Sequence, residues 1–123
     1  MHKRYIVLDP GFEHQDSHHP VVNGQLYNAC SDKEKFVIVT SKQLCFESPW
    51  KGAEVIPYFD VNLYPDGYQD LPPSLYSETV EGFVNNLNIL FDELKVGDGD
   101  CLIIHTALSY LYEALGKSLY CGV

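Results

Sequence analysis

Side chains that could do acid–base chemistry lie in two short stretches, each directly after a predicted strand. The first stretch runs from Asp9-Pro-Gly11 to Ser17-His18-His19, and the second is His105-Thr106. Histidine gains and loses protons near neutral pH, so these residues suit a general base or a hydrogen-bond donor to a ligand. A helix beginning near His18 would add free backbone N–H groups and a positive dipole end, which suit a phosphate or diphosphate.

Two apolar runs, residues 5–8 and 101–104, predict the buried strands that carry these stretches. In a parallel sheet of order 3-2-1-4, the first and fourth strands are neighbours, and the ligand crevice lies at their carboxyl ends. We therefore predict one cleft that contains His18, His19 and His105. Two alternatives stay open: His105 as a structural histidine at a strand end, and His18-His19 as an exposed helix start.

The remaining pattern predicts one Rossmann-like domain over residues 1–123, a three-layer α/β/α fold with a small, mainly parallel sheet of order 3-2-1-4. Residues 36–40 and 54–59 are the other strands, the latter at an edge because Pro57 cannot donate to a ladder. Helices are expected near residues 18–30, 41–45, 80–94 and 108–119. The first helix is expected to be capped by Asp16 or Ser17, with this apolar face: Val22, Leu26, Ala29 and Cys30. The third is expected to begin at Ser77 and stop at Gly97.

Composition excludes several classes of function. The net charge is −9 and the eight Lys and Arg residues are scattered, so we predict no nucleic-acid partner. No apolar run approaches the ~20 residues of a membrane span, and no signal peptide is recognisable, so a cytoplasmic location is expected. The four cysteines lack Cys-x-x-Cys spacing and are interpreted as reduced, with Cys30 and Cys101 at core positions.

A metal site and a cofactor site both lack a recognisable motif. Ligand-type side chains crowd residues 13–19, but their spacing does not place them on one helix face, so we predict no metal and no cofactor. The glycine fingerprints of dinucleotide-binding domains and P-loops are missing, as is the serine-hydrolase elbow. Four tyrosines could form a sugar-binding lip or the core of their own loop: Tyr58, Tyr64, Tyr68 and Tyr76.

The order of these motifs resembles the N-terminal, acceptor-side domain of bacterial GT-B glycosyltransferases. The resemblance covers most of the chain: a strand, Asp9-Pro-Gly11, the pair His18-His19, Asn23 on the first helix, and Asp100 separated from His105 by four residues. Ser17 stands where that family usually has glycine.

The resemblance implies transfer of a sugar from a nucleotide-diphosphate donor to an acceptor. It implies His105 as the catalytic residue and the following substrate-binding residues: Gly11, Ser17, His18, His19, Asn23 and Thr106. Because such enzymes bind the donor mainly through a second domain, we expect a partner domain or a homodimer, and little turnover by this chain alone. The alternatives are a non-catalytic interaction or dimerisation module and, less favoured, a small metal-dependent hydrolase.

Overall fold

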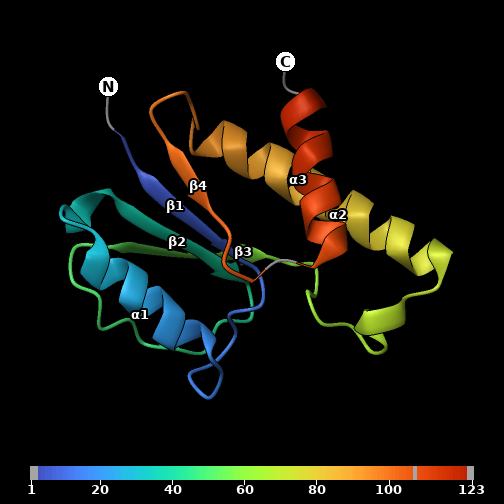
Figure 1. Cartoon of the computed structure of the whole chain (residues 1–123), viewed down its shortest axis with the longest axis horizontal. Helices are drawn as coiled ribbons and strands as arrows, with labels where there is room; N and C mark the ends of the chain where they lie inside the picture. Colours follow the sequence, from blue (N-terminus) through green and yellow to red (C-terminus); the bar gives the residue numbers. More distant parts are fainter. Residues whose placement is uncertain (1–2, 107, 122–123) are drawn as a thin grey trace. The chain divides into compact units, whose positions relative to one another are not determined.

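Four parallel strands in the order β3-β2-β1-β4 form the sheet of this protein (Figure 1). The computed structural model describes residues 3–106 and 108–121, with side chains up to residue 118 in the second range. The strands are as follows: β1 Tyr5–Asp9, β2 Phe36–Ser41, β3 Glu54–Phe59 and β4 Cys101–Ile103. The predicted α/β class and strand order are confirmed.

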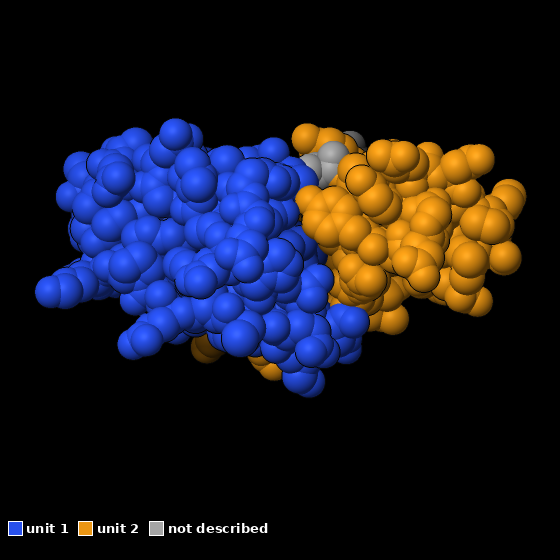
Figure 2. All heavy atoms as spheres, turned by 90° about the horizontal axis from the view of Figure 1, so that it is seen from below, with its two compact units in different colours: residues 1–60, 97–106 blue, residues 61–96, 107–123 orange. Residues whose placement is uncertain are grey.

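The chain divides into two compact units, coloured separately in Figure 2. Unit 1 comprises residues 1–60 and 97–106, which include the sheet and helix α1 (His19–Ala29). Unit 2 comprises residues 61–96 and 107–123, which include α2 (Pro73–Glu93) and α3 (Ser109–Cys121). None of the described helices combines the length and apolar composition that crossing a bilayer requires.

The core of unit 1 forms where α1 packs on one face of the sheet. Its buried members are Val7, Phe12, Phe36, Ile38 and Trp50, and Leu26 and Tyr27 of α1 pack against them. Strands β1 and β2 are buried along almost their whole length, as their continuous apolar sequence predicts. β3 lies at the sheet edge, so Pro57 needs no ladder partner on its outer side.

Several predicted boundaries in unit 1 are wrong. α1 is capped by the backbone of His18 rather than by the side chain of Asp16 or Ser17. Its fully buried positions are polar, His19 and Asn23, whereas Ala29 of the predicted apolar face is exposed. Residues 41–45 form a turn instead of a short helix, because Cys45 N–H bonds to the Glu13 carbonyl in a bridge to the loop after β1.

The cysteine prediction holds only in part. Cys30, Cys45 and Cys101 are free thiols. Cys30 is half-buried, but Cys101 is exposed because β4 is an edge strand. The side chain of Cys121 lies outside the described residues.

In unit 2, α2 begins at Pro73 rather than at Ser77, since proline fits the first turn of a helix, and it ends at Glu93, before Gly97. α2 and α3 pack together through the parallel rings of Phe83 and Tyr110. Tyr112 of α3 is exposed. Of the four loop tyrosines, Tyr64 and Tyr68 contact each other edge to face, which agrees with a local core.

Candidate functional site

Strand register brings the two polar stretches together at the carboxyl edge of the sheet. β1 and β4 pair in parallel with Tyr5 opposite Cys101 and Val7 opposite Ile103. Continuing that offset by two residues places His105, two residues after the end of β4, beside Asp9 at the end of β1. This is the point of a doubly wound sheet at which ligands bind.

Helix α1 supplies the other two members of the site. Asp9 follows Val7 by two residues and therefore points to the face of the sheet on which α1 packs. His19 and Asn23 are one helical turn apart and both face that strand end, where they are 2% and 0% exposed. Burying polar side chains is favourable only when they are hydrogen-bonded, so these residues require partners.

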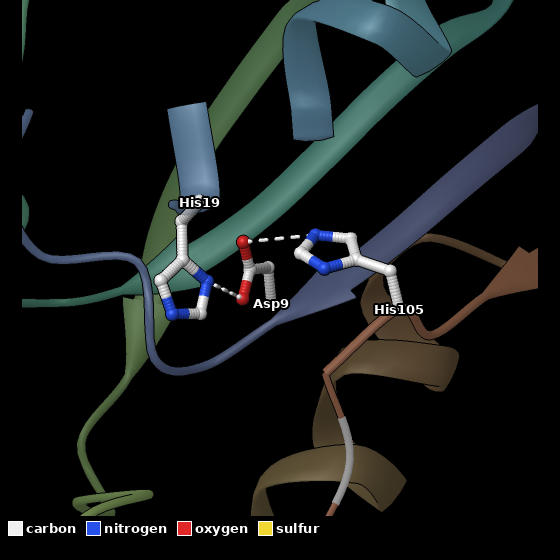
Figure 3. Close-up of side chains that lie close together, drawn as sticks. All are labelled: Asp9, His19 and His105. Atoms are coloured by element: carbon white, nitrogen blue, oxygen red, sulfur yellow. Dashed lines mark hydrogen bonds and ion pairs between the residues drawn. The ribbon is translucent and has the colours of Figure 1, made fainter. Parts of the chain in front are cut away.

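The partners meet at the carboxylate of Asp9, which is fully buried and lies between His19 and His105 (Figure 3). His19 Nδ1 lies 2.7 Å from Asp9 Oδ1, and His105 Nε2 lies 3.2 Å from Oδ2. Asn23 Nδ2 donates to Oδ2 at 2.9 Å, and its Oδ1 lies 2.9 Å from His105 Nε2. We name these four residues the Asp9 cluster.

The Asp9 cluster continues outward through a hydroxyl. His105 Nδ1 lies 2.9 Å from Thr106 Oγ1, which in turn lies 3.2 Å from Nε2 of the exposed His18. The rings of His18 and His19 also lie close, with centroids 4.1 Å apart. A path of hydrogen-bonding groups thus runs from the buried carboxylate to the surface.

Electrostatics keep the carboxylate ionised despite its burial. Burial alone would raise the pKa of Asp9, but hydrogen bonds from His105, His19 and Asn23 lower that pKa to about 2. An ionised Asp9 accepts only, so His19 Nδ1 and His105 Nε2 carry the hydrogens. The second nitrogen of a neutral His105, Nδ1, then accepts a hydrogen bond from Thr106. Partial burial and the neighbouring His19 lower the pKa of His18.

Acid should remove the stability that Asp9 contributes. Because the folded-state pKa is below the ordinary 3.8, the contribution is full above about pH 4 and is lost as the pH falls towards 2. We expect this loss to be about 2 kcal/mol more in the unmodified protein than in Asp9→Asn, measured by urea unfolding with chelator present.

The comparison with Asp9→Asn is needed because Arg4 holds the pKa of Asp100 at about 2 as well, so Asp100 contributes over the same pH range. The exposed Asp66 offers a matched control: Asp66→Asn should keep the full acid dependence. Equal acid dependence in Asp9→Asn and the unmodified protein would contradict the assigned pKa.

Aromatic rings support the cluster from the side of the loop after β1. Phe12 is fully buried, and its ring is parallel to that of His19, with centroids 6.3 Å apart. The ring of Phe12 also contacts those of Trp50 and Phe46, with centroid separations of 6.2 and 5.1 Å. His19 is therefore held on one side by the Asp9 carboxylate and on another by packing.

The structure gathers most of the residues predicted for the site. His18, His19, Asn23, His105 and Thr106 lie within the hydrogen-bonded path described above. Gly11 lies in the turn that Phe12 N–H closes on the Asp9 carbonyl, and the Ser17 hydroxyl bonds to the carbonyl of His14. Ligand binding by these residues stays a prediction.

Asp9 is the residue that the sequence-based site omits. A charged residue at the end of a buried strand, two positions after a core valine, was the available signal. Asp9 lies beside His105 because of the register between β1 and β4. It contacts His19 because of the position of α1.

Comparison with protein-family models, with curated proteins and with solved structures found no match for this chain. The fold and the site by themselves thus define a small Rossmann-like α/β protein with a buried Asp–His cluster at the carboxyl edge of its sheet.

Proposed function

We propose that this chain is the acceptor-binding part of a GT-B-type glycosyltransferase, with His105 as the general base. The observation that carries the proposal is that both ring nitrogens of His105 have a hydrogen-bonding partner. Nε2 lies against the buried Asp9 carboxylate, and Nδ1 faces Thr106 at the outer side of the cluster. A carboxylate that fixes one imidazole nitrogen leaves the other as an oriented base.

In this proposal a hydroxyl of the acceptor hydrogen-bonds at Thr106 and His105. Its proton moves to His105 Nδ1 as the oxygen attacks the anomeric carbon of the donor sugar, and the nucleoside diphosphate leaves. Asp9 stabilises the imidazolium that forms. The nucleotide sugar would be held by a second domain, as the resemblance to this family implies.

The chemistry of the cluster supports an uncharged acceptor. The groups that meet at Asp9 and Thr106 are imidazoles, an amide and a hydroxyl, which donate to and accept from sugar hydroxyls. Diphosphates are instead bound by Arg, Lys or glycine-rich backbone turns, which add positive charge.

An NMR titration of the ¹⁵N-labelled chain in metal-free buffer tests the proposal. We expect neutral oligosaccharides at millimolar concentration to shift the ring signals of His105 and the amide of Thr106, and nucleotide-diphosphate sugars to shift them much less. His105→Ala should abolish the shift of the Thr106 amide. His14→Gln, a change at an exposed histidine of the same loop, should preserve these shifts.

A response to nucleotide sugars alone would assign the donor side and contradict the proposal. No response to any sugar, combined with self-association, would favour the alternative of an interaction module.

A further inference from the structure

The Asp9 cluster also presents a set of metal-ligand atoms. One ring nitrogen of His19, one of His105 and a carboxylate oxygen of Asp9 all lie within 4.8 Å of one another. They come from three separate elements: the end of β1, the first turn of α1 and the segment after β4 (Figure 3). Two imidazoles and one carboxylate are a ligand set used by Zn²⁺ and other divalent transition metals.

The surroundings of these atoms resemble the outer shell of a metal centre. Ligating histidines and carboxylates are usually oriented by hydrogen bonds to their other atoms. Here Asn23 Nδ2 holds Asp9 Oδ2, and Thr106 Oγ1 lies on the second nitrogen of His105. Asp9 and His19 are nearly inaccessible to water, whereas the His105 side chain is 11% exposed.

We propose that the Asp9 cluster binds one divalent transition-metal ion through His19, His105 and Asp9, in place of the hydrogen bonds among them. The proton of neutral His19 shifts from Nδ1 to Nε2, and that of His105 shifts from Nε2 to Nδ1, so binding needs no net proton release. His105 Nδ1–H then donates to Thr106. Carboxylate coordination replaces the two imidazole N–H bonds to Asp9.

Metal binding requires the His19 and His105 nitrogen atoms, which lie within 4.8 Å of each other, to approach to tetrahedral spacing. Metal bonds of 2.0–2.2 Å in tetrahedral geometry separate ligand atoms by about 3.3 Å. The 3.2 Å between His105 Nε2 and Asp9 Oδ2 already fits, and the 2.7 Å between His19 Nδ1 and Asp9 Oδ1 must open by about half an ångström.

Metal binding would inhibit the proposed transferase, a consequence that rests on the proposed function. With Nε2 on the metal and a hydrogen on Nδ1, His105 has no basic nitrogen left. The metal site itself can be tested without any transfer assay.

Titration of the full chain with Co²⁺ and Zn²⁺ tests the site. We expect one ion per chain, the visible absorption bands of four-coordinate Co²⁺, their loss on adding Zn²⁺, and ¹⁵N shifts at His19 Nδ1 and His105 Nε2. His105→Ala should weaken Zn²⁺ binding at least about 100-fold, and Thr106→Val about 10-fold. His14→Gln changes an exposed histidine outside the ligand set and should leave the affinity unchanged.

Absence of a stoichiometric Co²⁺ complex would overturn the site. Equal weakening in His14→Gln would also overturn it, by assigning the metal to surface histidines. If His105→Ala fails to fold, the ¹⁵N shifts of the unmodified protein decide. Because the sugar titration is done without metal, either proposal can fail while the other stands.

Discussion

Asp9→Ala is expected to lower the free energy of unfolding by about 3–5 kcal/mol, the cost of removing one partner from a buried charged network. The carboxylate is fully buried and accepts from His19, His105 and Asn23. Alanine would leave these buried donors without that acceptor, and water cannot replace it without entering the core. Urea unfolding followed by circular dichroism at pH 7 measures the loss.

Two further variants separate the cause. Asp9→Asn keeps the shape of the side chain and some of its hydrogen bonds. Its free energy of unfolding should therefore lie between that of the unmodified protein and that of Asp9→Ala. Asp66→Ala removes an exposed carboxylate in unit 2 and should change stability by no more than about 0.5 kcal/mol. A loss below about 1 kcal/mol in Asp9→Ala would show that the cluster does not hold α1 to the strand ends.

The strand order was predictable because apolar runs and their intervening segments determine topology in parallel α/β folds. The register of the strands was not predictable from the sequence. A continuous apolar run such as residues 5–8 has no alternation of apolar and polar residues, so nothing in it indicates how it aligns with the neighbouring strand. The offset that pairs Tyr5 with Cys101 is what sets His105 beside Asp9. The sequence thus predicted a shared edge, but not the contact.

The inward face of α1 shows a second limit. The apolar pattern predicts that Val22 and Ala29 face the core, and it gives no signal that His19 and Asn23 are fully buried. The His19 and Asn23 side chains are buried because Asp9 hydrogen-bonds to them, and Asp9 lies on a strand ten and fourteen residues earlier. A buried network of this kind is recognisable only when all its members are in place.

Edge position explains the misassignment of Cys101. Residues 101–104 are as apolar as β1, yet β4 has a strand on one side only, and its first residue is exposed. Apolar sequence predicts a strand there, whereas the burial of each residue depends on what the rest of the chain places over it.

Trp50→Ala is expected to cost about 3–5 kcal/mol as well, because it leaves a large cavity in the core of unit 1. Trp50, the only tryptophan, is 9% exposed and contacts Phe12, Tyr27 and Phe46. Unfolding should be followed by circular dichroism, since the variant lacks the fluorophore. Trp50→Phe fills part of the space and should cost less.

The consequence of Trp50→Ala for the site distinguishes support from mere stability. Phe12 lies between Trp50 and His19, so a cavity at Trp50 lets Phe12 move away from the imidazole with which it is parallel. We expect the ring signals of His19 to broaden or shift in conditions where the variant is still folded, while Tyr112→Ala, at an exposed position in unit 2, leaves them unchanged. Unchanged His19 signals in folded Trp50→Ala would mean that Asp9 alone holds this histidine, because hydrogen bonding would then suffice without the aromatic packing.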